Sequence, residues 1–287
     1  MTDRTGMRQV VSPDRFARAG RRFEGSASTA ALIALSFCLS GSVGWAQSNP
    51  LTADFTNPAG TTVMIMGNLD GAGFTYTNEG VTEMIDGSIS NLGTYSNRAG
   101  QTTIGGGAAP QSLEAGTVSN AALLLMDDNG TITATQVDNI LGGTLTSTGE
   151  INGAITNSGA LNVAGAINGT LTNSGTNARV TVTDTLVQDG SVDLGNDTFL
   201  DVSGGDYTGA TTLTNRGTIT LTNDTTLEAD TLNNQGAGVV TVNEDTTLDA
   251  GDITSGGQIT NDGTILGNIN SSGTIVTSPR ISPVVTM

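Results

Sequence analysis

The chain has 287 residues, enough for one large or two ordinary domains, with 40 Gly, only 3% aromatic residues and a formal net charge of −17. Histidine is absent and all ten basic residues are Arg, which excludes the common Ser-His and Cys-His catalytic arrangements. The acidic balance also argues against nucleic acid as a partner, because phosphate binding needs a basic surface.

The N-terminal segment, residues 1–46, is predicted to be an export signal with a basic extension. Two arginines precede an apolar run over 30–39, and the small residues Gly44 and Ala46 stand at positions −3 and −1 of a cleavage site before Gln47. The run has about ten strongly apolar residues, too few to span a bilayer comfortably, so an uncleaved anchor is the less favoured alternative.

Cleavage changes the character of the chain that remains. It removes six Arg and three acids, which leaves 24 acids against four Arg, a formal charge of −20, and it removes the only Cys and the only Trp. An exported chain without cysteine must be held together by something other than disulfides.

Residues 47–277 contain an internal repeat with a period of about 20 residues. The sequence INGAITNSG at 151–159 recurs as INGTLTNSG at 167–175, and the same pattern can be aligned from Ile85 and Leu141. A repeat of this length is typical of architectures in which each unit stacks on its neighbours.

The repeat predicts an all-β fold, a single-stranded β-solenoid built from imperfect coils. Segments such as 218–222 alternate apolar residues with Thr, the pattern of half-buried strands, and end in Asn-x-Gly, where Asn and Gly accept a positive φ. No coil buries its own apolar face, so each is expected to stack on the next, about 4.8 Å away. A β-sandwich is the alternative, but it gives no reason for side-chain identity to recur at fixed intervals.

The alignment also predicts which side chains face inward. Leu227 is expected to lie over Leu248 and Leu232 over Ile253, whereas Thr225 is expected to face water. The predicted inward positions are Ile151, Ile155, Ile167, Leu171, Leu227, Leu232, Leu248 and Ile253.

The region 47–277 is long enough for on the order of a dozen coils, a rod about 55–60 Å long. It is least regular at 99–135, where 105–110 is expected to be a loop and 121–126 either a buried strand or a short helix. Residues 278–287 carry two prolines and are expected to form a C-terminal tail or cap, because proline stops strand pairing.

The succession of a basic extension, a signal peptide and Thr-, Asn-, Ser- and Gly-rich coils over about 60–287 resembles the passenger regions of autotransporter proteins of Gram-negative bacteria. The resemblance implies a right-handed parallel β-helix at the cell surface or outside the cell, often an adhesin. Such passengers are followed by an outer-membrane β-barrel, and no barrel-like segment follows here. The chain is therefore expected to need a separate outer-membrane barrel for display, and to remain in the periplasm without one.

The acidic residues suggest little specific chemistry. Asp197, Asp201 and Asp206 lie on neighbouring segments and could hydrolyse a glycoside as a carboxylate pair, but acids are frequent enough here for close pairs to occur by chance. The sequence at 127–130 lacks the alternating ligands and distant Glu of a calcium loop and is interpreted as a turn. Arg216, in a corner, is expected to be a solvated tip.

No catalytic, cofactor-binding or metal-binding residue is predicted, and Ca²⁺ is expected only as a weak, diffuse counterion of the acidic surface. Most aromatic side chains are expected to pack in the core or at a cap rather than to stack against sugars. After the signal, they are Phe55, Phe74, Tyr76, Tyr95, Phe199 and Tyr207.

Three functions remain open at this point. The favoured one is a non-catalytic surface rod that adheres to a host or to neighbouring cells. The alternatives are a polysaccharide-acting solenoid enzyme that uses acidic residues, and a truncated passenger without a function of its own.

Overall fold

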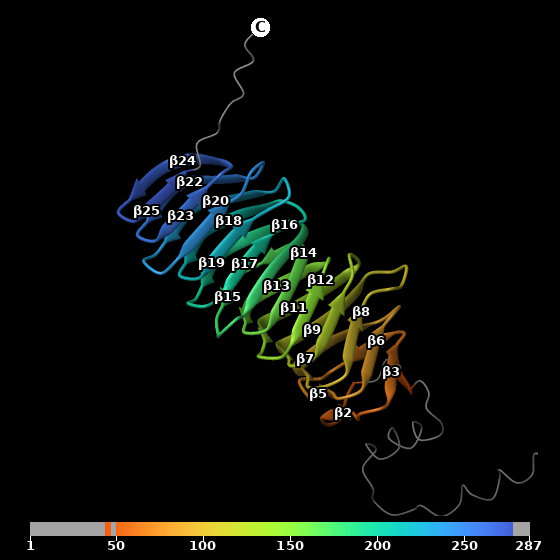
Figure 1. Ribbon diagram of the computed structural model, residues 1–287. Coiled ribbons are helices and arrows are strands. Elements are labelled where there is room, and N and C mark those ends of the chain that lie inside the picture. The colour runs from red at the N-terminus through yellow and green to blue at the C-terminus, as the bar shows by residue number, and fades with distance from the viewer. Residues whose placement is uncertain (1–43, 47–49, 278–287) are drawn as a thin grey trace, which may run out of the picture.

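The computed structural model describes residues 44–46 and 50–277, and Figure 1 shows a rod of stacked coils. Residues 1–43 of the predicted signal segment, the three residues 47–49 after the predicted cleavage site and the tail 278–287 lie outside the described residues. The described residues form 25 strands, and none of them belongs to a helix long and apolar enough to cross a bilayer.

Each coil passes through three short β-segments, which we name the A, B and C faces in chain order. On the A face, the second and fourth residues of a four-residue strand point inward. The A-face strands are β1 (Gly44–Ala46), β3 (Thr62–Ile65), β6 (Val81–Met84), β8 (Gln101–Ile104), β10 (Leu123–Met126), β12 (Thr144–Ser147), β17 (Phe199–Val202), β19 (Thr218–Leu221), β21 (Val239–Val242), β23 (Gln258–Asn261) and β25 (Thr274–Thr277).

The B and C faces are mostly the two halves of one longer strand that bends in the middle. These strands are β7 (Ser88–Asn97), β9 (Gln111–Asn120), β11 (Gly130–Asn139), β13 (Glu150–Asn157), β18 (Tyr207–Asn215), β20 (Thr226–Asn234), β22 (Thr247–Ser255) and β24 (Thr264–Ser271). Separate strands form the B face at β4 (Asn68–Asp70) and the C face at β2 (Phe55–Asn57), β5 (Thr75–Asn78) and β15 (Leu171–Asn173). Two strands continue from face to face, β14 (Ala160–Asn168) and β16 (Arg179–Leu194).

All pairings between coils are parallel, with about 19 residues from one coil to the next and about 12 coils in total. The predicted β-solenoid is therefore confirmed. The pairs Leu227–Leu248 and Leu232–Ile253 are in register, as are Ile151–Ile167 and Ile155–Leu171. All eight predicted inward side chains are 0–1% exposed.

The segment 99–135 forms strands β8 to β11. Its Leu123–Met126 stretch is strand β10, which pairs with β8 and β12 over all four residues, so the short-helix alternative is wrong. Residues 105–110 lie between strands β8 and β9, as expected of a loop.

Three sequence assignments are wrong. Leu141, aligned with the inward Ile151, is 78% exposed in the turn between the C and A faces, and Ile85 lies in the turn that follows β6. Partners in neighbouring coils are separated by between 16 and 24 residues, so a fixed spacing cannot assign a motif to a face. Thr225, expected to face water, is 2% exposed, and its hydroxyl donates to the carbonyl of Thr222 at 3.0 Å.

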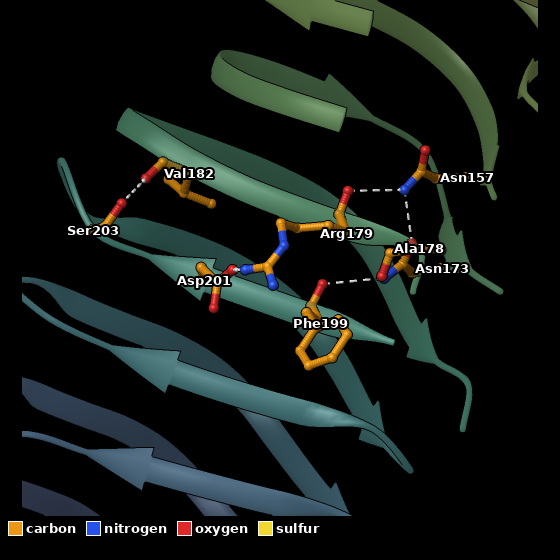
Figure 2. Close-up of polar contacts among 8 residues, drawn as sticks. All are labelled: Asn157, Asn173, Ala178, Arg179, Val182, Phe199, Asp201 and Ser203. Atoms are coloured by element: carbon orange, nitrogen blue, oxygen red, sulfur yellow. Dashed lines mark hydrogen bonds and ion pairs between the residues drawn. The ribbon is translucent and has the colours of Figure 1, made fainter. Parts of the chain in front are cut away.

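A column of buried asparagines runs along the last position of the C face. Along six consecutive steps from Asn57 to Asn173, each Nδ2 donates to the Oδ1 of the next asparagine at 2.7–2.9 Å. The same Nδ2 also donates to a backbone carbonyl of the following coil, as Asn157 does to Arg179 at 3.0 Å (Figure 2). A buried amide is tolerated when it is hydrogen-bonded in this way. The members, none more than 1% exposed, are Asn57, Asn78, Asn97, Asn120, Asn139, Asn157, Asn173, Asn215 and Asn234.

The Asn-x-Gly turns after this column do not have the positive-φ asparagines that the sequence predicts. The column asparagines are not among the described non-glycine residues with positive φ, which are Ala72, Asn91, Asn177, Asp197, Asn223, Asp224 and Asp245. The glycine of Asn-x-Gly is needed for a different reason, because the backbone of the preceding coil approaches it closely. A Cβ on Gly159, for example, would lie 2.2 Å from the carbonyl oxygen of Gly143.

The asparagine column is interrupted at one coil by Leu194, which pairs with Asn173 and Asn215. The Nδ2 of Asn173 instead donates to the carbonyls of Ala178 and Phe199, both at 3.1 Å (Figure 2). Beyond the interruption the column resumes, with Asn215 donating to Asn234 at 2.9 Å.

Replacing Leu227 with Asp tests the inward assignment. The carboxylate would be buried without a partner, so we expect the free energy of unfolding to fall by roughly 3–5 kcal/mol in urea titrations followed by circular dichroism. The matched control is Thr211→Asp, at an exposed position of β18, which we expect to change stability by less than about 0.5 kcal/mol. Equal losses in the two variants would contradict the assignment.

Replacing Leu194 with Asn tests the asparagine column. The new amide can accept from Asn173 and donate to Asn215, whereas the same change at Leu213, also 0% exposed, leaves an unpaired amide in an aliphatic column. We expect Leu194→Asn to be at least about 2 kcal/mol less destabilising than Leu213→Asn. Similar urea midpoints for the two variants would show that the column has no such role.

Candidate functional surface

The outward side chains of the C face form two rows that run the length of the rod. Strand alternation places them on either side of the inward residue that precedes the asparagine column. One row contains Thr75, Thr94, Thr117, Gln136, Ala154, Thr170, Ser191, Thr212, Thr231, Asp252 and Asn268, and the other contains Thr56, Ser96, Ser119, Asp138, Thr156, Thr172, Asp193, Thr214, Asn233, Thr254 and Asn270. Thr77 has the equivalent position in its coil but is buried.

These rows hold short side chains rich in hydroxyl and amide groups. Threonine dominates, and its branched Cβ restricts the first side-chain torsion. The inward residues between the rows, such as Val118 and Leu213, are fully buried. Because these residues hold the strands in register, they also fix the position of each outward side chain along the rod axis. The C face is therefore a regular polar surface that repeats about every 4.8 Å.

The three faces differ in charge. The outward positions of the B face carry six carboxylates, Asp70, Glu114, Glu150, Asp189, Glu228 and Asp249. The C face carries three, of which Asp193 is paired with Arg216 and Asp138 accepts a hydrogen bond from Gln136 at 2.8 Å. The B face is thus the acidic side of the rod. The C face and the A face, whose described outward positions carry only two carboxylates, Glu83 and the ion-paired Asp201, are closer to neutral.

The A face carries an isolated polar cluster. The guanidinium of Arg179 bonds to the carboxylate of Asp201 in the next coil and lies 4.7 Å from the ring centroid of Phe199 (Figure 2). Both partners of the ion pair are partly exposed, so the pair is worth little to stability. Asp201, one of the three carboxylates considered for glycoside hydrolysis, is therefore held in this ion pair.

The other two candidate carboxylates have separate positions around the coil. Asp206 precedes β18, and its Oδ1 accepts from the backbone N–H of Thr226 at 2.8 Å. Asp197 lies in the turn between the C and A faces with a φ of 57°. The structure places Asp197, Asp201 and Asp206 at three different points of the coil rather than at one site.

The sequence 127–130 forms a turn, as interpreted. The carboxylate of Asp127 accepts from the backbone N–H groups of Asn129 at 3.0 Å and Gly106 at 2.5 Å. Within the described ranges, no group of three or more His, Cys, Asp or Glu side chains is placed to hold a metal ion. Arg216 is in a corner, but it is ion-paired with Asp193 rather than a free solvated tip.

The aromatic residues near the N-terminal end lie mainly inside the rod. The rings of Phe55, Tyr76 and Tyr95 are in contact from coil to coil. Phe55 is tilted against Tyr76 with centroids 5.0 Å apart, and Tyr76 stacks on Tyr95 with centroids 5.3 Å apart. The hydroxyls of Tyr76 and Tyr95 bond to Thr82 and Thr102 at 3.1 and 2.7 Å. The expectation of core packing is confirmed for these residues, and no aromatic side chain lies in the two outward rows of the C face.

No known protein family, curated protein or solved structure matches this chain.

Three buried tyrosines make the rod sensitive to alkali. Burial raises the pKa of Tyr76, Tyr95 and Tyr207, and in Tyr95 the hydrogen bond to Thr102 partly offsets that rise. Each neutral tyrosine therefore contributes stability that is fully present below the unfolded pKa of about 10 and is lost as pH rises above it.

Replacing Tyr207 with Phe should reduce this alkaline loss by about 1.4 kcal/mol per pH unit above pH 10. At neutral pH the change should be within about 1 kcal/mol, because the hydroxyl of Tyr207 makes no hydrogen bond within the described protein. The comparison is Tyr95→Phe, which loses a 2.7 Å hydrogen bond and should cost about 1 kcal/mol. Urea unfolding between pH 7 and 11 measures both, and an unchanged alkaline slope in Tyr207→Phe would contradict the account.

Proposed function

We propose that this protein is an exported, non-catalytic rod that acts by contact at the cell surface, in adhesion or cell–cell association. The observation that carries the proposal is the C face, whose hydroxyl and amide side chains repeat in register along about 12 coils. Each such group offers only a weak hydrogen bond, but many of them in one line gain strength when they engage together.

The fold supports the resemblance to autotransporter passengers at the level of architecture, a β-solenoid of about 12 coils. We propose that the chain is a passenger of this kind, cleaved before Gln47 and displayed through a separate outer-membrane barrel. Strand β1 lies upstream of that cleavage site and pairs with β3, so cleavage removes the strand that covers β3 on that side.

The negative charge of the rod predicts how its contacts should depend on ionic strength and on Ca²⁺. A rod of charge −20 repels other acidic surfaces at low ionic strength, and the repulsion is screened as salt is added. Diffuse binding of Ca²⁺ by the carboxylates of the B face should have the same effect.

The proposal is tested by displaying residues 47–287 on bacterial cells through a borrowed barrel. We expect cell clumping or attachment to surfaces, rising between about 10 and 150 mM salt and with added Ca²⁺, as the screening length shortens from about 30 to about 8 Å. Cells that carry the barrel alone are the control. Behaviour identical to that control under every condition would contradict the proposal.

A further inference from the structure

The two outward rows of the C face form a regular array of hydroxyl groups. Seven of the eleven positions in each row are threonine or serine. Neighbouring coils place these side chains about 4.8 Å apart along the rod, and the two outward residues of one strand lie about 6.6 Å apart across it. Both positions carry a hydroxyl in four coils, at Thr94 and Ser96, Thr117 and Ser119, Thr170 and Thr172, and Thr212 and Thr214.

The other two faces lack such an array among the described coils. On the A face both outward positions carry a hydroxyl in two coils, at Thr144 and Thr146 and at Thr218 and Thr220. The B face is interrupted by its six carboxylates. Larger side chains interrupt both rows of the A face, namely Met64, Leu123, Leu125, Arg179 and Phe199. The C face therefore carries the most regular array of short hydroxyl side chains.

This array has nearly the spacing of the oxygen atoms in ice. Each water molecule in ice bonds tetrahedrally to four others about 2.8 Å away. That geometry places equivalent oxygens about 4.5 Å apart within a layer and about 7.4 Å apart from one equivalent layer to the next. The hydroxyl array differs from these spacings by about 0.3 Å per coil along the rod and by less than about 1 Å across it.

The C face also holds its hydroxyls in fixed positions. The branched Cβ of threonine restricts its first side-chain torsion, and fully buried residues such as Val118 and Leu213 hold the backbone between the two rows. A surface that is already ordered loses little entropy when it binds an ordered lattice. Gln136, Asp138 and Asp193 interrupt the array, and the mismatch accumulates with each coil, so the match to ice extends over a few coils at a time.

We propose that the C face binds the surface of ice crystals, with threonine and serine hydroxyls at the positions of lattice waters. Each hydroxyl both donates and accepts a hydrogen bond, as a lattice water does. Single contacts are weak, but the rows engage many of them at once, so the rod should stay adsorbed and slow the growth of the crystal. The inference goes beyond the proposed function, because an isolated rod in solution should bind ice without display on a cell.

The test measures thermal hysteresis, the gap between the melting and the growth temperature of a single ice crystal, in solutions of the exported protein as isolated from cells. The C-face variant is Thr117→Leu with Thr212→Leu, which removes two hydroxyls and raises two longer side chains above the row. The matched control is Thr146→Leu with Thr220→Leu on the A face, at similarly half-buried positions. Partition of the protein into slowly growing ice gives a second readout.

Thermal unfolding checks that each rod is intact. If a double variant is unfolded, the single changes Thr117→Leu and Thr146→Leu replace the pairs.

We expect the wild type to show thermal hysteresis that rises with its concentration and to be enriched in the ice fraction. Both effects should fall at least about fivefold in the C-face variant and less than about twofold in the control. A wild type with no hysteresis and no enrichment in ice would overturn the inference, as would equal losses in the two variants. Cell clumping and attachment are measured without ice, so such a result would leave the proposed function standing.

Discussion

Parallel hydrogen bonding along the rod axis is the interaction on which the rest of the structure depends. Each backbone segment pairs with the equivalent segment one coil away, so each side chain lies over its counterpart, as Ile219 lies over Val240 and under Leu200. The side chains stacked in one column must therefore be able to pack against one another. Columns of aliphatic side chains bury apolar area, whereas the asparagine side chains can be buried only because their amides hydrogen-bond to one another and to the backbone.

The same constraint organises the outside of the rod. Because the inward columns fix the register, the outward side chains also line up from coil to coil. A residue type that recurs at one outward position therefore forms a row along the rod axis. The B face gathers carboxylates in this way, and the C face gathers hydroxyls. The rod therefore presents one strongly acidic side and another side rich in hydroxyl groups.

Much of this fold could be predicted from the sequence, since Leu227 and Leu248 recur in equivalent surroundings and alternate with threonine. The asparagine column could not, because polar residues are ordinarily assigned to the surface, and only the three-dimensional register shows that Asn139 meets Asn157. The recurrence of Asn-x-Gly is the available signal, but in the sequence it indicates a turn conformation rather than a buried column. The sequence pattern misplaces Leu141 because the number of residues per coil varies, so local similarity does not identify the face on which a residue lies.

The sequence predicts the candidate surface only in general terms, as a rod rich in Thr, Asn and Ser. Its division into an acidic and a hydroxyl face depends on which alternate residue of each strand points outward, and on the bend that separates B from C. Neither follows from composition. The three candidate carboxylates, by contrast, are close in sequence but lie at separate points around one coil. Closeness in sequence therefore does not bring their side chains together.

The central claim, in-register stacking along one axis, is tested most directly by distances between spin labels on outward positions of a single A-face row. With Cys38 absent or replaced, cysteines introduced at Thr103, Thr220 and Thr260 can be labelled in pairs. Thr103 and Thr220 are six coils apart and Thr103 and Thr260 eight. Pulsed electron paramagnetic resonance should give distances near 29 and 38 Å, growing by about 4.8 Å per coil. Distances that do not grow with the number of coils would contradict the stacking.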